Sequence, residues 1–272
     1  MSEAWDAAAW QVLEAELRAW RAEGRVASLW WRDDDAGPGD PALARLLAVA
    51  AREAVPLGLA VVPAWLTPET ADVIRAAPPG VVVLQHGFAH TNHETRPPAG
   101  ERKVRPAECG SARPAEAALA EIRVGRERLV DAFESRFRPV FVPPWNRIAP
   151  AVVAGLPGLG HHAVSTFGSR PAPDGPPGLR WLNCHADPIV WREGRRFVGA
   201  RATLERLHAH LVARRERRID AREPTGLLTH HRDMDPAFWT FLERLMGRLR
   251  GHPGVGLPAI DTLTTAALDA PA

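Results

Sequence analysis

The stretch WWRDDDAG, residues 30–37, places three consecutive aspartates directly after an apolar run. Carboxylates of like charge repel one another, so the cluster is either a polar, solvated turn or a place where a cation belongs. The run VASLWW, residues 26–31, predicts a strand that is buried on both faces. Asp40 and Pro41 already supply the cap and first turn of the next helix, which leaves the triplet without a structural role.

Strands alternate with helices along the chain, and this alternation is typical of a parallel sheet. The predicted strands cover residues 26–31, 57–62, 80–85, 139–142, 161–166, 180–185 and 226–231. The predicted helices cover residues 1–24, 41–53, 111–136, 149–154, 203–217 and 236–250, and a further one begins at Thr67. In a chain of 272 residues this pattern favours a closed α/β barrel over an open sheet. We expect one barrel domain over residues 1–272, with the helix in residues 1–24 packed on it.

The composition argues against several classes of partner. The formal net charge is +2, from 34 basic and 32 acidic side chains, which gives no electrostatic case for binding nucleic acid or an anionic membrane. The N-terminal residues lack the basic start and apolar run of a signal peptide, so we expect a soluble, cytoplasmic protein. Cys109 and Cys184 are too few for a disulfide scaffold or a thiolate metal site.

Polar clusters fall at the ends of five predicted strands. They are RDDD (32–35), QHGFAHTNH (85–93), PPWNR (143–147), NCHAD (183–187) and THHRD (229–233). In a parallel α/β barrel the carboxyl ends of the strands meet on one face, where active sites are found. We therefore expect these five clusters to form one functional site.

The histidines in this set suggest a metal. His86 and His90 are four residues apart, so both can point the same way from a helical turn or a tight loop. Two imidazoles with one carboxylate suit a divalent first-row metal and leave positions open for water. His93 follows closely as an alternative ligand or a hydrogen-bond partner. Ordinary surface or capping histidines are the competing interpretation.

The order of these clusters resembles that of the polysaccharide deacetylases, the NodB-like, metal-dependent carbohydrate esterases of family 4. In that family a strand ends in two aspartates, a catalytic base followed by a metal ligand. The resemblance implies that Asp34 is the base and Asp35 the ligand, with a shift by one residue, to Asp33 and Asp34, left open. His86 and His90 match the family's two histidine ligands.

Other motifs match in part. The family's third motif, Arg-x-Pro-(Tyr or Trp), shapes the substrate groove and orients the base, and here Pro144 and Trp145 are kept in the turn PPWNR, which also carries Asn146. Val142 stands where the arginine belongs, so Arg147 is the conjectured source of the guanidinium. The motif Leu-x-His supplies the general acid, which LLTHH matches through His230, with His231 where the family often has aspartate. Asp187 is similar to the carboxylate that tunes this histidine.

The resemblance implies a distorted barrel with seven strands and a hydrolase that deacetylates an N- or O-acetylated sugar or a related small molecule. Asp34 would take a proton from a metal-bound water and His230 would give one to the departing group, with Pro144, Trp145, Asn146 and His93 lining the substrate groove. The bond cleaved is a non-peptide carbon–nitrogen bond or an ester. Zinc is the expected metal, with cobalt, nickel, manganese and iron as alternatives. Because Val142 departs from the motif, an inert barrel that binds carbohydrate without turnover is the alternative function.

Overall fold

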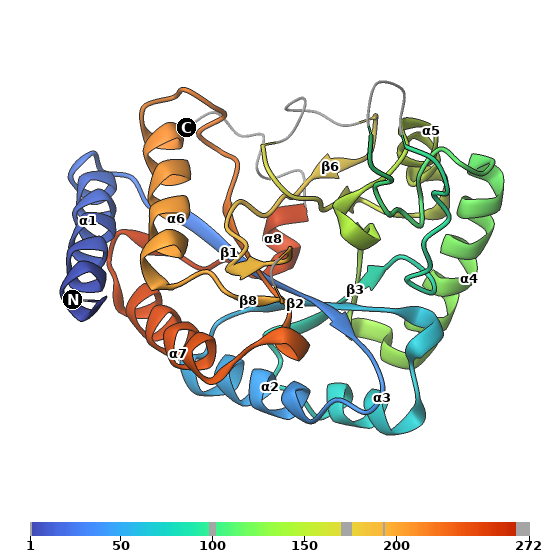
Figure 1. The fold of residues 1–272 in the computed structure, drawn as a ribbon, viewed down its shortest axis with the longest axis horizontal. Coiled ribbons are helices and arrows are strands. Elements are labelled where there is room, and N and C mark those ends of the chain that lie inside the picture. The colour runs from blue at the N-terminus through green and yellow to red at the C-terminus, as the bar shows by residue number, and fades with distance from the viewer. Residues whose placement is uncertain (1, 98–101, 170–175, 193, 265–272) are drawn as a thin grey trace.

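The computed structural model describes residues 2–97, 102–169, 176–192 and 194–264 (Figure 1). The helices are α1 (Ser2–Ala22), α2 (Pro41–Glu53), α3 (Pro68–Arg75), α4 (Ala115–Phe133), α5 (Pro150–Gly155), α6 (Ala200–Arg215), α7 (Pro236–Gly251) and α8 (Ile260–Thr264). The strands are β1 (Ala27–Ala36), β2 (Leu57–Val61), β3 (Val81–His86), β4 (Phe137–Val142), β5 (Ala163–Val164), β6 (Arg180–Trp181), β7 (Ile189–Val190), β8 (Arg196–Phe197), β9 (Thr225–Thr229) and β10 (Val255–Gly256).

Within the described residues, seven strands pair in parallel in the order β9-β1-β2-β3-β4-β5-β6, and the sheet curls into an incomplete barrel. A short eighth strand, β10, pairs beside the start of β1. An isolated bridge between Ala186 and Leu227 links the segment after β6 to β9 and so brings the two edges of the barrel together. The distorted α/β barrel predicted from the sequence is confirmed.

Side chains on β1 alternate between the barrel interior and the layer of helices outside it. Trp30 packs in the interior cluster of buried residues, whereas Trp31 packs in the outer cluster. Because neighbouring residues of a strand point to opposite faces, Arg32 and Asp34 share the interior face with Trp30. Asp33 faces the helices together with Trp31. The acidic triplet is therefore divided between two environments.

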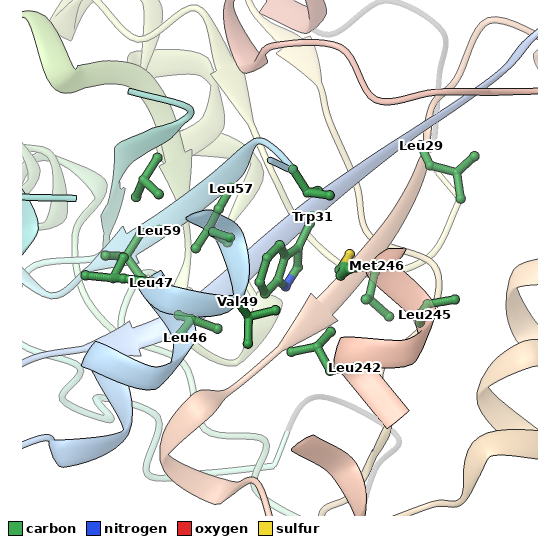
Figure 2. Packing of buried hydrophobic residues seen from close by; sticks show 14 of the residues in the cluster. Leu29, Trp31, Leu46, Leu47, Val49, Leu57, Leu59, Leu242, Leu245 and Met246 are labelled. Atoms are coloured by element: carbon green, nitrogen blue, oxygen red, sulfur yellow. The ribbon is translucent and has the colours of Figure 1, made fainter. Parts of the chain in front are cut away.

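The outer cluster fixes β1 against two helices. Figure 2 shows Trp31 surrounded by apolar side chains from α2 and α7, among them Leu46, Val49, Leu242, Leu245 and Met246. Fully burying one such side chain contributes roughly 1.5–3 kcal/mol of stability. Helix α1 joins the same cluster through Leu13, Leu17 and Trp20, and it lies beside α6 (Figure 1). This packing holds the carboxyl end of β1 in place.

Helix α8 closes one end of the barrel. Ile260 and Leu263 belong to the interior cluster, and Asp261 accepts a hydrogen bond from Arg138 near the start of β4 (2.8 Å). This is the end where the strands begin. The opposite end, where the strands finish, carries the polar clusters predicted from the sequence.

Several local features differ from the sequence predictions, among them β10 and α8, which were not predicted. Strand β1 continues through the aspartates to Ala36, so the triplet lies in a strand and not in a turn. Strands β5 and β6 are shorter than predicted, and the antiparallel pair β7–β8 was not predicted. No helix in the described residues combines the length and the hydropathy that crossing a bilayer requires.

Candidate metal centre and acid–base site

Asp35 leaves the regular alternation of β1. The register of β1 against β2 shifts between Asp33 and Ala36, and Asp35 has a left-handed φ of 67°. An extra residue of this kind bends a strand and re-aims a side chain. Asp35 consequently turns toward β3, whereas strict alternation would place it with Asp33 on the outer face.

Asp35, His86 and His90 bring one oxygen and two nitrogens together. Oδ1 of Asp35 lies 3.0 Å from Nε2 of His86 and 3.2 Å from Nε2 of His90. Among the described residues these three side chains form one of two groups whose potential ligand atoms lie within 4.8 Å of one another. His86 is buried at the end of β3, whereas Asp35 and His90 are partly exposed. One side of the group is therefore open to water and substrate.

The hydrogen bond of His86 decides how its ring can be used. Nδ1 of His86 lies 3.0 Å from the carbonyl oxygen of Val142, and a carbonyl only accepts, so Nδ1 carries a proton. In the neutral ring Nε2 is then a lone pair that faces the carboxylate of Asp35. Two acceptors at this distance need a positive charge between them. The donor set fits a divalent cation, for which neutral imidazole nitrogen and carboxylate oxygen are ordinary ligands.

The pKa shifts point the same way. Burial alone would raise the pKa of Asp35, but its contacts with His86 and His90 hold it well below the usual range. Burial would lower the pKa of His86, yet the charges of Asp34 and Asp35 raise it above its ordinary value. The point between the three side chains thus stabilises positive charge.

A carboxylate from the loop after β3 shapes the turn that carries His90. Glu108 is buried and accepts hydrogen bonds from the backbone N–H groups of Phe88 (3.0 Å) and Ala89 (2.7 Å). A Cβ at Gly87 would lie 1.9 Å from Oε2 of Glu108, so only glycine fits there. His90 itself has a φ of 55°. His86 and His90 therefore meet through a strand end and a tight turn, without a helix.

Asp34 lies beside this group on the interior face of β1. Nη2 of Arg32 donates to its Oδ2 at 3.0 Å, and Nε of Arg32 lies 2.9 Å from its Oδ1. Both oxygens of this buried carboxylate are therefore paired with the Arg32 guanidinium. Nε2 of His230 lies 3.9 Å from Oδ2. The structure thus brings the predicted base and the predicted acid to one place.

Arg32 was not among the predicted site residues. It is fully buried, and its Nη1 donates to the carbonyl oxygen (3.0 Å) and hydroxyl (2.6 Å) of Ser165, while Nη2 also donates to Oδ1 of Asn146 (2.6 Å). The guanidinium that contacts Asp34 belongs to Arg32, whereas the sequence had led us to expect Arg147 there. Arg147 donates to the carbonyl oxygen of Pro106 (2.8 Å) because its turn directs it into the long loop. Period-two alternation along β1 is the signal that would have identified Arg32.

The sequence predicted that Asp187 acts on His230, but the two side chains form no hydrogen bond in the described structure. Its carboxylate accepts hydrogen bonds from the backbone N–H of Ile189 (3.0 Å) and from Nε1 of Trp191 (2.7 Å). The ring of Trp191 packs edge-on against the ring of His230, with centroids 4.5 Å apart. Asp187 reaches the histidine only through this tryptophan, because the turn after it uses both carboxylate oxygens.

The remaining predicted substrate residues divide between the site and the loop. Pro144 and Trp145 lie in a short 3₁₀ turn. The ring centroids of Trp145 and His90 are 4.3 Å apart. His93 lies outside the ligand group, and its backbone N–H donates to the carbonyl of Ala107 (3.0 Å). Trp145 thus lies beside the ligand His90, as does Trp65 with ring centroids 5.5 Å apart, and His90 takes the place for which His93 was an alternative.

Asp33 points away from the site. It pairs with His231, which is buried at the end of β9 on the helix side of the sheet. Asp33 therefore contacts neither histidine of the ligand group, and the geometry favours Asp34 and Asp35 over a pair shifted by one residue.

A second histidine cluster joins α6 to β9, where His185 and Glu223 contact each other at 3.2 Å and the rings of His185 and His210 stack with centroids 3.5 Å apart. The backbone N–H of Gly226 donates to Nδ1 of His185 (3.0 Å), so the neutral ring carries its proton on Nε2. That nitrogen donates to Glu223 and has no lone pair for a metal. The cluster is a hydrogen-bonded part of the core, in contrast to the group around Asp35.

No protein-family model and no curated protein sequence matches this chain. Solved structures do. A candidate polysaccharide deacetylase from Mycobacterium smegmatis superposes with a TM-score of 0.60 over 88% of both chains at 16% identity. The T48 deacetylase with substrate has a TM-score of 0.50, 16% identity and coverage of 88% of this chain and 90% of that one. A BA3943 mutant, described as a CE4 family pseudoenzyme with restored enzymatic activity, has a TM-score of 0.52, 15% identity and coverage of 88% and 67%.

Identities this low make the likeness one of fold, over most of the chain. The chain has the distorted α/β-barrel fold of the CE4 polysaccharide deacetylases.

Proposed function

We propose that the protein is a metal-dependent hydrolase that removes an acetyl group from an N- or O-acetylated sugar or a related small molecule. The observation that carries this proposal is the group formed by Asp35, His86 and His90, in which Nδ1 of His86 faces the carbonyl oxygen of Val142 and Nε2 faces the carboxylate of Asp35. Two imidazoles and one carboxylate suit zinc first, with cobalt, nickel, manganese and iron as alternatives. A cytoplasmic location stays a prediction from the sequence.

A cation held by these three side chains would polarise the acyl carbonyl and lower the pKa of a water molecule beside it. Asp34 is placed to take a proton from such a water, because it precedes Asp35 on β1 and lies close enough to His86 for its charge to raise the pKa of that histidine. His230, close to Asp34, is placed to give a proton to the departing amine or alcohol. Trp145 offers an aromatic face for a sugar ring beside His90.

Binding without turnover is the second candidate function. It is favoured by Val142, which stands where the family's third motif has arginine, and one structure with the same fold is described as a CE4 family pseudoenzyme. The substrate class of the first candidate rests on the names of similar structures, a polysaccharide deacetylase among them. Hydrolysis of an ester or amide that is not part of a sugar is a variant of the first candidate function.

The test measures acetate release from a chromogenic acetyl ester and from an N-acetylated amino-sugar oligomer, with protein loaded with each divalent metal in turn. We expect Asp35→Ala to lose both metal binding and turnover, and Asp34→Asn to keep the metal and lose turnover. His162→Gln, which alters an exposed histidine far from the site, controls for hydrolysis of the ester by surface imidazoles. One bound metal per chain without turnover of either substrate would favour the binding barrel. If the two aspartate variants exchanged their results, the assignment of ligand and base would be reversed.

A further inference from the structure

Arg32 is a buried cation with a single buried carboxylate for its partner at the site. It is fully buried, and both oxygens of Asp34 lie within 3.0 Å of its nitrogens. Burying a guanidinium is costly unless it is paired and hydrogen-bonded, so this contact is a strong constraint on both side chains. Burial would lower the pKa of Arg32, but the charge of Asp34 raises it.

We propose that Arg32 is the positioning residue of Asp34, and that it supplies from β1 the guanidinium that the turn after β4 lacks. This inference rests on the proposed function, in which Asp34 is the base. Val142 and Trp30 belong to the same interior cluster, and Arg32 lies on the same face of β1 as Trp30. A guanidinium can therefore approach the base through the barrel interior from β1 or from β4. In this chain it comes from β1.

The surroundings of Arg32 keep it from moving with its partner. Ser165 at the end of β5 and Asn146 in the turn after β4 each accept a hydrogen bond of 2.6 Å from it. The guanidinium is thus anchored on the far side of the barrel and holds Oδ2 of Asp34 in one orientation. Oδ1 lies 2.9 Å from Nε of the same guanidinium, so both oxygens of the carboxylate are held. Asn146, predicted to bind substrate, contributes through Arg32 in this arrangement.

A double-mutant cycle tests whether Arg32 acts through Asp34. We expect Arg32→Met to lower kcat about 100-fold with KM changed less than threefold, because a small displacement of a reacting group costs rates of that order. One metal per chain should still bind. Added to Asp34→Asn, Arg32→Met should lower kcat no further, because the group that it positions is already gone. Losses that multiply in the double variant would overturn the proposal.

Arg214→Met is the matched control. Arg214 is equally buried, but it donates to Ser28 and Thr225 and contacts no carboxylate of the site. It should lower stability without lowering kcat. If Arg32→Met alone fails to fold, the comparison of Asp34→Asn with the double variant still decides, since both lack the buried carboxylate charge.

A structural readout separates this inference from the proposed function. If the wild-type protein turns over no substrate, the proposed function fails, and the crystal structure of the metal-loaded Arg32→Met variant tests the positioning on its own. The carboxylate of Asp34 should then leave its place while Asp35, His86 and His90 stay unmoved. An Asp34 that keeps its orientation without Arg32 would overturn the inference.

Discussion

Asp33 and His231 form a buried ion pair that joins the ends of β1 and β9. Nδ1 of His231 faces Oδ1 of Asp33, and the backbone N–H of His231 donates to Oδ2 (3.2 Å). The other ring nitrogen lies 2.5 Å from Oδ2 of Asp40, the N-cap of α2. Burial would lower the pKa of His231, but the two carboxylates raise it to about 10. A cation between two anions therefore ties both strands to a helix behind the candidate site.

Removing this cation should destabilise the fold. His231→Gln leaves Asp33 buried without its positive partner, whereas Asp40 keeps Arg232 at 2.9 Å, and breaking a buried pair from one side costs about 3–5 kcal/mol. We expect a loss of that order in the free energy of unfolding, measured by urea denaturation at pH 7. The exposed His162→Gln variant should change it by less than about 0.5 kcal/mol. A loss below about 1 kcal/mol for His231→Gln would mean that the ion pair contributes little.

The same pair predicts a loss of stability in alkali. The pKa of His231 is raised from 6.5 to about 10, so its contribution is fully present below pH 6.5 and is lost as the pH rises through 10. The two buried thiols, with pKa values raised by burial to about 12, act in the same direction above roughly pH 8.5. The difference between wild type and His231→Gln isolates the histidine. It should shrink steadily between pH 7 and pH 10, and a constant difference would contradict the raised pKa.

Glu108 should support metal affinity although it lies far from the ligands in sequence. Glu108→Gln replaces one acceptor on the turn of Phe88 and Ala89 with a donor at nearly constant volume, which loosens the turn that carries His90. Changes to groups that orient metal ligands cost 10–100-fold in affinity. We expect at least a tenfold weaker zinc affinity by competition with a chromogenic chelator. Glu94→Gln, which alters an exposed cap on Ala112, should change it less than twofold.

The strand ends and the histidine pair could be predicted because they depend on local pattern. An apolar run followed by polar residues marks the carboxyl end of a buried strand, and the barrel brings such ends together. The spacing of His86 and His90 and their position at the end of β3 were therefore enough to predict them as a ligand pair. The roles of Asp34 and Asp35 needed more, because the shift in β1 that turns Asp35 toward β3 has no sequence signal.

The partners of these residues lie at long range, which is why the sequence did not identify them. From the sequence alone Arg32 is predicted to be a surface charge, because the predicted strand ends before it. In the structure β1 continues through Arg32, which is buried. Glu108 contacts the turn after β3 from 20 residues away. Asp187 was assigned to His230 by motif order, but the local turn at Ile189 takes its carboxylate instead.

The two histidine clusters should differ in metal binding, and stoichiometry shows this directly. We expect one divalent cation per chain in the wild-type protein, measured by elemental analysis after dialysis and by calorimetric titration with zinc. Asp35→Ala should bind none. Glu223→Gln should still bind one, because Nε2 of His185 donates a proton and offers no lone pair.

Glu223→Gln should show its effect in stability instead. Burial raises the pKa of Glu223, but its contacts with His185 and His210 hold it below the usual range, so its contribution is present above roughly pH 4.3. Burial lowers the pKa of His210 from 6.5 to about 4, so further stability is lost as the pH falls from 6.5 through 4. The variant should therefore unfold at lower urea concentration at pH 7 while its metal content stays at one. Two cations in the wild type, falling to one in each variant, would show that the second cluster is also a metal centre.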